Sequence, residues 1–244
     1  MFEDGARALI VTPTYNERDN LEPFLAGVFR WAPKADVLVV DDASPDGTGS
    51  LADEIAARDE RVRVMHRPGK MGLGSAYLTA FAEGLKRADY DAFLEMDTDL
   101  SHDPQYLPQF FAALDRGADA VIGSRNIPGG GVEGWGLGRH LISKGGSLYS
   151  RAILGLPIKD LTSGYKAFRR PALEALDLPS VRSEGYSFQI EMTYRLVRKG
   201  FRVEELPIVF VDRRQGASKM SRKIFVEAIG VVWKLRADAL IGKL

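Results

Sequence analysis

The 244-residue sequence contains no cysteine, which excludes disulfide bonds, zinc–thiolate sites and catalysis by a thiol. It has only three histidines, His66, His102 and His140, and their positions show no metal-ligand spacing. We interpret them as structural, with His102 the one candidate for lining a site. No stretch approaches the roughly 18 apolar residues of a membrane-spanning helix, and no basic segment precedes the first apolar run. We therefore expect neither a spanning helix nor a secretory signal.

The chain also lacks a net charge, because 33 Lys and Arg residues balance 33 Asp and Glu residues. A neutral protein has no general attraction to polyanions, so we expect no nucleic-acid partner. The charge is unevenly distributed, however, and segments 139–170 and 213–244 are both strongly basic. Basic segments are usually solvated surface, but these two also suit a surface that faces phosphates or an anionic bilayer.

Short apolar segments alternate with segments of helical periodicity through the first half of the chain. The expected strands are residues 7–13, 36–42, 61–66, 91–97 and 119–125, and the expected helices are residues 17–31, 45–57, 75–87 and 104–114. Ser44 before Pro45 is typical of an N-cap followed by the first helical residue. Regular alternation of this kind indicates βαβ units. We expect an α/β fold with a mainly parallel, twisted sheet and helices on both faces.

The second half of the chain is less regular. Residues 127–138 contain six glycines and a proline, so we expect a mobile loop without secondary structure there. Helices are expected near residues 139–154 and 187–199, and a strand near residues 203–211. The last segment, 222–244, has the pattern of an amphipathic helix with basic residues. Such a helix either packs on the sheet or lies at a membrane surface, and the sequence leaves both open.

Polar residues follow the first three expected strands, at the edge of an open sheet where ligands bind. Residues 12–20 carry a proline, an aromatic residue and an acid that could hold a base and a ribose. Asp41 and Asp42 close the second strand, where a carboxylate suits a ribose diol or a base edge. Glycines before the third helix could let backbone N–H groups approach an anion. An ordinary turn explains the first of these segments equally well, and a helix-start turn explains the third better than an anion site does.

Asp97 and Asp99 follow the fourth expected strand. On an extended backbone these two carboxylates would point the same way and Thr98 would point away. Their mutual repulsion would be relieved by Mg²⁺ or Mn²⁺, which prefers oxygen ligands and completes its shell with phosphates and water. A single Asp-x-Asp spacing is common by chance. At a strand end beside other carboxylates it predicts a metal–diphosphate site.

Basic residues in two other places would suit the same anionic ligand. Arg125 ends the fifth expected strand and could contact phosphate oxygens in forked geometry, or form a surface ion pair. Arg213, Arg214 and Lys219 surround a turn of small residues, as in a flexible phosphate clamp.

Together these motifs resemble the dolichol-phosphate (polyprenyl-phosphate) mannosyltransferases, inverting GT-A glycosyltransferases of family 2. The resemblance covers nearly the whole chain, through PTYNERDNL, VDDASPDGT, GLGSAY, MDTDLSHDP, GSR, GGGVEGWGLGRHLIS, DLTSGYKAFRR, EGYSFQIEMTYR and FVDRRQGASKMS. The early motifs are typical of nucleotide-sugar-binding folds in general. The later ones are more specific and imply GDP-mannose as the donor and a polyprenyl monophosphate as the acceptor.

The resemblance implies a role for each matching residue. The nucleotide would be bound by Pro13, Tyr15, Glu17, Asp42, Gly72 and Asp97. A Mg²⁺ or Mn²⁺ ion on Asp97 and Asp99 would bind the diphosphate, Arg125 would contact phosphate, and these three residues would carry the catalysis. The acceptor phosphate would be met by Arg139 and Ser143 and enclosed by Arg213 and Lys219. The GT-A domain would be residues 1–221, and residues 222–244 would form a helical extension, either part of that domain or membrane-interfacial.

The sequence departs from the family pattern in two ways. Many membrane-anchored relatives carry Gln two residues after the second Asp, where this chain has Ser101, a poorer ligand that leaves one coordination position to water. The C-terminal transmembrane helices of some relatives are also missing from this sequence. We therefore expect a cytoplasmic protein, peripherally associated with the cytoplasmic face of a membrane through its own surface or an anchoring partner.

The expected reaction needs no general base, because a phosphate monoester is already ionised near neutral pH. The acceptor phosphate would attack the sugar in line, with inversion. Three alternatives stay open from the residues. They are glucosyl transfer from UDP-glucose to the same lipid, a non-catalytic nucleotide-sugar-binding subunit, and a nucleotidyltransferase, whose glycine-rich N-terminal signature is absent after Val11.

Overall fold

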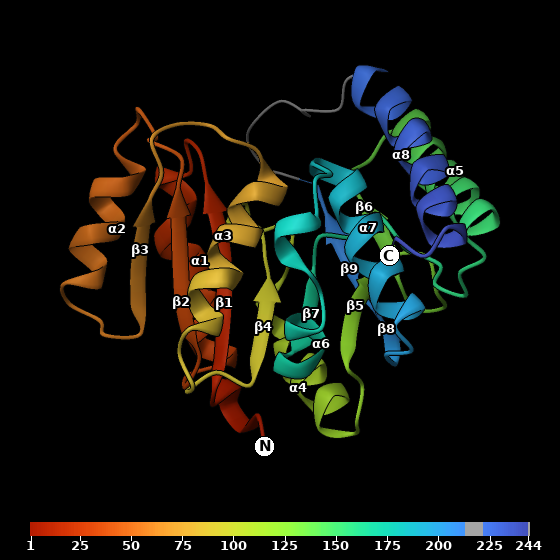
Figure 1. Ribbon diagram of the computed structural model, residues 1–244. Helices are drawn as coiled ribbons and strands as arrows, with labels where there is room; N and C mark the ends of the chain where they lie inside the picture. Colours follow the sequence, from red (N-terminus) through yellow and green to blue (C-terminus); the bar gives the residue numbers. More distant parts are fainter. Residues whose placement is uncertain (213–221, 244) are drawn as a thin grey trace.

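The computed structural model describes residues 1–212 and 222–243, and for residues 137, 139–142 and 222–229 it describes the backbone alone. Its centre is a seven-stranded sheet (Figure 1). In spatial order the strands are β3 (Val62–His66), β2 (Asp36–Asp41), β1 (Ala8–Thr14), β4 (Ala92–Glu95), β7 (Lys166–Arg169), β5 (Ala120–Ser124) and β8 (Val203–Pro207). Only β7 runs antiparallel to its neighbours among these strands. The predicted mainly parallel α/β fold is confirmed.

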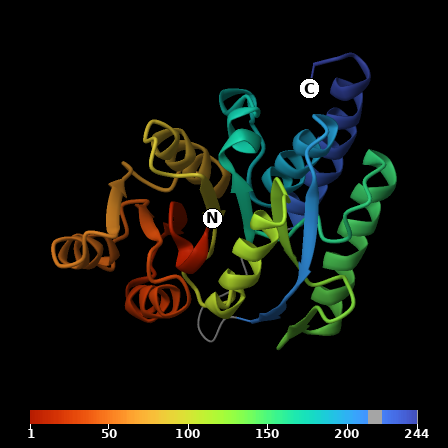
Figure 2. The ribbon, with the colours of Figure 1, turned by 90° about the horizontal axis from the view of Figure 1, so that it is seen from below.

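Helices cover both faces of this sheet, as the view from below shows (Figure 2). They are α1 (Arg18–Trp31), α2 (Thr48–Ala56), α3 (Leu73–Leu85), α4 (Leu107–Asp115), α5 (Leu137–Leu154), α6 (Arg170–Glu174), α7 (Gly185–Arg198) and α8 (Arg222–Leu240), with short 3₁₀ turns at Glu3–Gly5, Pro104–Tyr106 and Leu178–Ser180. The boundaries of the first four helices and strands lie within a few residues of those expected from periodicity.

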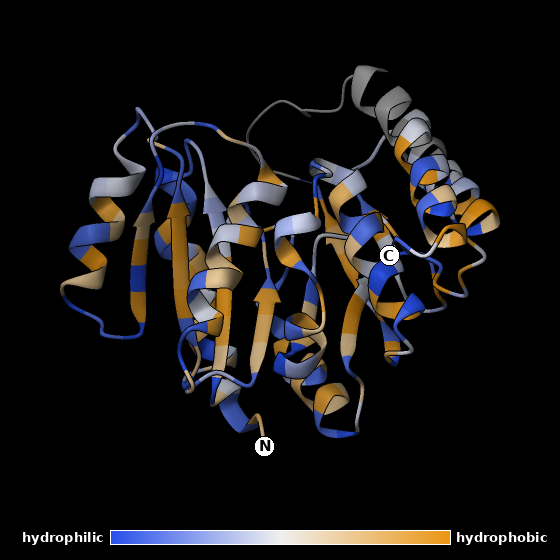
Figure 3. Ribbon diagram, in the orientation of Figure 1, coloured by the Kyte–Doolittle hydropathy of each residue, from blue (hydrophilic) through white to orange (hydrophobic). Residues whose placement is uncertain are grey.

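The alternation of side chains along β1 explains the two layers. Leu9 and Val11 pack with Tyr77 of α3 in one core, whereas Ile10 packs with Phe24 of α1 in the other. All of these side chains are buried. Successive residues of a strand point to opposite faces, so a strand covered on both sides needs apolar residues throughout. That is why the central strands are continuously hydrophobic, while their connecting loops are more polar (Figure 3).

A third hydrophobic cluster lies beyond β5, where α5, α7 and α8 pack against each other. Val232, Leu235 and Ala239 of α8 are buried there, together with Leu154 of α5 and Tyr194 of α7. One face of the C-terminal helix therefore packs on the rest of the chain. The domain boundary expected near residue 221 falls in 213–221, outside the described residues.

The expected start of the second helix at Ser44–Pro45 was wrong. Ser44 donates its N–H and its hydroxyl to the Asp41 carboxylate, so it belongs to the loop that follows β2. The helix begins at Thr48, after Gly47, whose φ of +85° is the left-handed conformation that favours glycine. The Asp46 carboxylate accepts hydrogen bonds from the N–H and hydroxyl of Thr48 at this start.

Three elements of the second half also differ from expectation. The glycine-rich segment 127–138, expected to be an unstructured loop, contains β6 (Gly131–Glu133), which pairs with β9 (Val209–Val211). The strand expected at 203–211 is divided into β8 and β9, which belong to different sheets. Strand β7 was not predicted, and it inserts antiparallel between β4 and β5. These pairings join segments far apart in sequence, and local periodicity contains no information on them.

Candidate functional site

The two acids of the Asp-x-Asp motif lie just beyond β4, which ends at Glu95. Asp97 lies in irregular backbone after the strand and Asp99 lies in the turn that follows, where Leu100 has a positive φ of 63°. The extended backbone expected here was therefore wrong. Thr98 does point inward, because its hydroxyl lies 2.6 Å from that of Thr12 and donates to the Pro13 carbonyl at 3.4 Å. The Asp97 side chain keeps 28% of its surface exposed, whereas Asp99 is 9% exposed.

Asp97 is in contact with two buried side chains. Its backbone N–H donates to Nδ1 of His102 at 2.9 Å, and His102 Nε2 lies 4.0 Å from its Oδ2. The Tyr77 hydroxyl makes a long hydrogen bond of 3.4 Å to its Oδ1. Burial and the nearby Asp97 carboxylate raise the pKa of Tyr77, so this hydroxyl keeps its proton. His102 thus lies directly at the site, a position that the sequence did not establish.

Ser101 contacts the second acid of the motif. Its N–H and its hydroxyl both donate to Oδ1 of Asp99, at 3.1 and 2.5 Å. Both residues are buried. Ser101 therefore orients Asp99.

The two carboxylates fit a divalent cation that shares its ligands with a substrate. Within residues 1–212 and 222–243 no cluster of three or more His, Asp or Glu side chains forms a complete metal cage. Mg²⁺ is usually held by one or two carboxylates, with substrate phosphates and water as the other ligands. Asp97 and Asp99 are the residues that could supply the protein part of such a shell.

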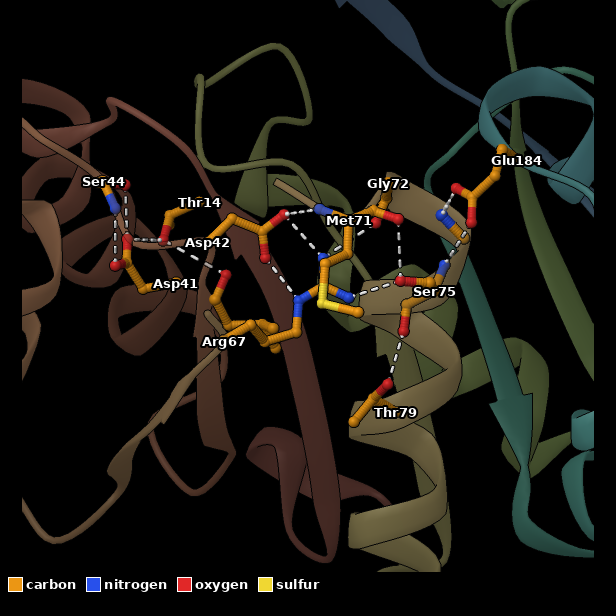
Figure 4. A network of polar contacts seen from close by, with 12 residues as sticks. Thr14, Asp41, Asp42, Ser44, Arg67, Met71, Gly72, Ser75, Thr79 and Glu184 are labelled. Carbon is orange, nitrogen blue, oxygen red and sulfur yellow. Dashed lines mark hydrogen bonds and ion pairs between the residues drawn. The ribbon is translucent and has the colours of Figure 1, made fainter. Parts of the chain in front are cut away.

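Asp42 lies at the end of β2 and forms a buried ion pair with Arg67 (Figure 4). Arg67 donates to both oxygens of Asp42, at 2.5 and 2.7 Å, and the Met71 N–H also donates to Oδ2. The same guanidinium donates to the Ser75 hydroxyl at 2.6 Å and to the Gly72 carbonyl at 3.1 Å. Arg67, which the sequence analysis did not assign, thus joins the ends of β2 and β3 to the start of α3.

The other residues predicted to bind the nucleotide lie around the end of β1. Pro13 is in β1 and is half-buried, and the ring of Tyr15 lies 4.5 Å from the Lys70 ammonium. Glu17 lies immediately before α1, where its carboxylate accepts a hydrogen bond from Asn20. The structure brings these residues to the same edge of the sheet as Asp42 and Asp97, since β1 pairs in parallel with both β2 and β4.

The start of α3, expected to face an anion of the ligand, faces a carboxylate of the protein (Figure 4). Glu184, just before α7, accepts hydrogen bonds from the N–H groups of Gly74 and Ser75 at 2.8 and 3.1 Å. Gly72 has a φ of +104°, and a Cβ there would lie 2.5 Å from a Glu184 oxygen. The glycines of this turn therefore admit Glu184. Local sequence offers no signal for this contact, because the two segments are about 110 residues apart.

Arg125 immediately follows β5 and is 8% exposed. Its Nε and Nη2 donate to the two oxygens of Asp160 at 2.7 Å, and Nη2 also donates to the Thr162 hydroxyl. The guanidinium carbon lies 5.5 Å from the Trp135 ring and 5.6 Å from the Phe210 ring. Burial favours the neutral form, but the Asp160 carboxylate outweighs it and holds the pKa of Arg125 above its ordinary value. Arg125 is thus a fixed, permanently charged group.

A buried polar pair lies two residues before Asp97. Glu95 of β4 is in register with Lys166 of β7, and neither has exposed surface. Gln189 of α7 donates to Glu95, and the Lys166 ammonium donates to the Gln189 carbonyl and the Thr193 hydroxyl. Burial raises the pKa of Glu95 to about 7 and lowers that of Lys166 to about 8.

The residues predicted to bind the acceptor are only partly described. Ser143 is half-buried on α5. Arg139 lies one turn earlier on the same helix, at a spacing that places two residues on one face, but its side chain is outside the description. Arg213, Arg214 and Lys219 lie outside the described residues.

Comparison with known proteins finds similar sequences along nearly the whole chain. The model of the family described as "Glycosyl transferase family 2" matches residues 9–177. "Polyprenol monophosphomannose synthase" of Mycolicibacterium smegmatis is 50% identical over 233 residues, which are 94% of this chain and 88% of that protein. "Undecaprenyl-phosphate mannosyltransferase" of Micrococcus luteus is 51% identical over 234 residues, 95% of each chain.

Solved structures of glucosyl-3-phosphoglycerate synthase from Mycobacterium tuberculosis share the fold. The complex with phosphoglyceric acid has a TM-score of 0.67 at 19% identity, over 96% of this chain and 81% of that one. The complex with Mn²⁺, uridine diphosphate and phosphoglyceric acid also has a TM-score of 0.67 at 19% identity, over 96% and 80%. At this identity the likeness shows the fold alone, which is the GT-A fold of glycosyltransferases.

Proposed function

The chain belongs to glycosyl transferase family 2, and from this premise we propose that it transfers mannose from GDP-mannose to a polyprenyl monophosphate. The observation that carries the proposal is the likeness to two polyprenyl-phosphate mannosyltransferases at about half identity. Because those matches cover 94% and 95% of this chain, they include both the nucleotide-side strands and the acceptor-side helices. The chain is therefore a glycosyltransferase of this class, and the donor nucleotide, the metal and the site residues are our proposal.

On the donor side, Pro13, Tyr15, Glu17 and Asp42 line the nucleoside, and Asp97 and Asp99 hold the cation. A bound Mg²⁺ or Mn²⁺ neutralises charge on the departing diphosphate. The exposure of Asp97 supports this assignment, since a carboxylate that meets a ligand needs open surface. Gly72 contributes by shaping the turn that receives Glu184.

On the acceptor side, the lipid phosphate is the nucleophile. It carries ~1.5–2 negative charges near neutral pH, so it attacks the sugar carbon without losing a proton to the protein. The chain's task is to hold two anionic groups together. Arg125 supplies a fixed positive charge and, because Nε and Nη2 bond to Asp160, it meets a phosphate with Nη1. Arg139, Ser143, Arg213 and Lys219 are assigned to the acceptor phosphate by resemblance.

The lipid acceptor requires contact with a membrane. Among the described residues, no helix is both long and apolar enough to span one. The helix α8 nevertheless carries exposed Trp233 and Leu240, followed by exposed Ile241, and the adjoining α5 carries exposed Leu148. Exposed apolar residues beside lysines, here Lys234, are typical of a helix that rests in the interface of an anionic bilayer. We propose peripheral association through this surface, at the cytoplasmic face of the membrane and with or without an anchoring partner.

The proposed function is tested by incubating the protein with a polyprenyl monophosphate and either GDP-mannose or UDP-glucose, with Mg²⁺, with Mn²⁺ or with a chelator. We expect mannosyl transfer from GDP-mannose that needs a divalent cation. Transfer from UDP-glucose alone would replace the donor assignment, and no transfer from either would support a non-catalytic binding subunit.

The matched variants are Asp99→Asn and Asp103→Asn. Asp99→Asn removes a proposed ligand and should lower turnover by about 100-fold or more, the scale of losing one group that stabilises transition-state charge. Asp103 caps the short turn after the motif by accepting from Gln105, so Asp103→Asn should stay near wild type. Full turnover by Asp99→Asn with a cation present would contradict the metal assignment.

A further inference from the structure

His102 contacts Asp97, the first acid of the Asp-x-Asp motif, at two points. Its Nδ1 accepts a hydrogen bond from the backbone N–H of Asp97 at 2.9 Å, and its Nε2 lies 4.0 Å from the Asp97 carboxylate. Since Nδ1 accepts, the neutral ring carries its proton on Nε2, the nitrogen nearer the carboxylate. The side chain is 2% exposed, so the ring lies behind the proposed cation site.

The ring is held in place by a column of aromatic side chains. It stacks on Tyr165 at 5.0 Å between centroids with an angle of 21° between planes, and Phe210 meets it edge-on at 5.8 Å. Tyr165 stacks in turn on Phe110 of α4 at 4.4 Å. A ring packed on two sides loses little further freedom when it accepts a hydrogen bond. The column therefore connects the position of Asp97 to the hydrophobic core.

The backbone leaves the sheet just before Asp97, where the Met96 N–H still donates to the Val11 carbonyl at 3.2 Å. Strand β4 ends at Glu95, and the motif continues through a turn with a positive φ at Leu100. Met96 is therefore held by β1, and Thr98 is held by Thr12 and Pro13. The N–H of Asp97 between them donates to His102. The Tyr77 hydroxyl of α3 reaches Oδ1 of Asp97 through a long hydrogen bond of 3.4 Å.

We propose that His102 is a positioning residue for the cation site, which fixes the backbone and carboxylate of Asp97 through its Nδ1 acceptor and its Nε2 edge. This inference rests on the proposed role of Asp97 as a cation ligand. Groups that orient the ligands of a metal change affinity or activity by about 10–100-fold when they are removed. His102 touches the ligand, and the substrate and the cation remain on the far side of Asp97.

The test separates the effect of the Nδ1 hydrogen-bond acceptor from the effect of the aromatic ring. His102→Phe keeps an aromatic ring in the column but has no acceptor, and His102→Asn places an oxygen where Nδ1 was but has no ring. Tyr165→Phe, which removes a hydroxyl bonded to the Asp103 carbonyl and keeps the ring, serves as the control. Thermal unfolding first establishes that each variant is folded.

Three quantities are measured for each variant. Electron paramagnetic resonance gives the Mn²⁺ affinity with GDP present. The other two are turnover at saturating Mn²⁺ and the hydrogen-exchange rate of the Asp97 amide. We expect His102→Phe to lose about 10–100-fold in Mn²⁺ affinity or turnover and its Asp97 amide to exchange faster. His102→Asn should retain most of the wild-type Mn²⁺ affinity, turnover and slow exchange of the Asp97 amide. Tyr165→Phe should match wild type in all three.

Two results would overturn the inference: a His102→Phe variant with wild-type Mn²⁺ affinity, turnover and exchange, or equal losses in the Phe and Asn variants, which would indicate ring packing alone. If the wild-type protein binds no Mn²⁺ with GDP, the metal assignment of the proposed function fails separately. The positioning role is then decided by exchange of the Asp97 amide and by turnover.

Discussion

At the scale of single residues, acids at the same edge of the sheet have different tasks because their neighbours differ. Asp41 accepts hydrogen bonds from Thr14 and Ser44 and organises a loop. Asp42 pairs with Arg67, whereas Asp97 retains exposed surface. Composition and spacing do not distinguish these carboxylates. Their partners, Thr14 and Ser44 for Asp41 and Arg67 for Asp42, decide which of them can meet a ligand.

The Asp42–Arg67 pair gives a prediction at this scale. Arg67→Met should lower the free energy of unfolding by about 3–5 kcal/mol, because removing one member of a buried ion pair leaves an uncompensated charge. The Arg116–Glu204 pair is mostly exposed, and an exposed pair contributes about 0–1 kcal/mol. Arg116→Met is therefore the matched control, and both are measured by urea denaturation. Equal effects of the two substitutions would contradict the prediction.

Arg67→Met should also weaken nucleotide binding. Without Arg67, the Asp42 carboxylate and the turn at Met71–Gly72 lose their common partner. Under conditions where the variant is folded, we expect the KM for GDP-mannose to rise by about 10-fold, which corresponds to about 1.4 kcal/mol. Arg67→Lys, which keeps the charge but not the fork, should be intermediate.

At the scale of elements, contacts between distant segments decide which groups the ends of helices and strands can bind. The start of α3 resembles an anion-binding turn in sequence, but Glu184 from the start of α7 occupies its N–H groups. Likewise β7, inserted between β4 and β5, aligns Lys166 with Glu95. Both contacts join elements of the first half of the chain to elements of the second half.

Two glycines of one turn test the Glu184 contact. Gly72 has a positive φ and an adjacent Glu184 oxygen, whereas a Cβ at Gly69 would meet nothing within 4 Å. Gly72→Ala should therefore destabilise the protein by on the order of 1–3 kcal/mol, and Gly69→Ala should change stability by about 0.5 kcal/mol or less. Adding Glu184→Ala to Gly72→Ala should relieve the steric part of the loss. Thermal unfolding checks all three, and a Gly69 effect as large as that of Gly72 would contradict the interpretation.

The exposed face of α8 gives the second prediction for an element. Trp233 is 58% exposed on α8, and Trp31 is 40% exposed at the end of α1. Trp233→Ser should reduce binding to vesicles that contain anionic lipid, because a tryptophan favours the membrane interface. Trp31→Ser should leave binding unchanged, since α1, which ends at Trp31, lies away from α5 and α8 (Figure 1). Vesicle sedimentation measures both, and equal losses would exclude the α8 surface.

At the scale of the whole molecule, seven strands and the helices on both faces form one body, in which a buried polar pair lies beneath the proposed site. Glu95 and Lys166 are fully buried. Burial raises the pKa of Glu95 and lowers that of Lys166, and both shifts favour the neutral form of the group. Such a pair adds little net stability, because desolvation offsets the attraction of the charges. It does make the stability of the whole fold depend on pH.

The sign of that dependence follows from the two pKa shifts. Glu95 has a pKa of about 7 when folded and an ordinary value of 4.5, so its contribution to stability is present below pH 4.5 and is lost as the pH rises through 7. Lys166 has a folded pKa of about 8 against 10.5, so its contribution increases from pH 8 to 10.5.

The wild-type protein should lose unfolding free energy between pH 5 and 7 as Glu95 ionises. Glu95→Gln should reduce that loss by on the order of 1–3 kcal/mol. The exposed acid Glu83, paired with Lys86 on the surface, provides the control Glu83→Gln. Denaturation at each pH measures the slopes. An unchanged slope in Glu95→Gln would contradict the assignment of the pH dependence to this buried group.

The sequence by itself determined the layers of the fold and the location of the site. Continuous apolar strands that alternate with amphipathic helices have one stable arrangement, a mainly parallel sheet covered on both faces, and its carboxyl edge gathers the polar strand ends. The presence of Asp42, Asp97 and Asp99 at that edge follows from this local periodicity. The tertiary structure alone decided the partners of these residues that lie far along the chain: Arg67 for Asp42, Asp160 for Arg125, and Glu184 for the start of α3. Such pairs join segments distant in the chain, and a periodic pattern specifies which face a residue occupies but not which residue it meets there.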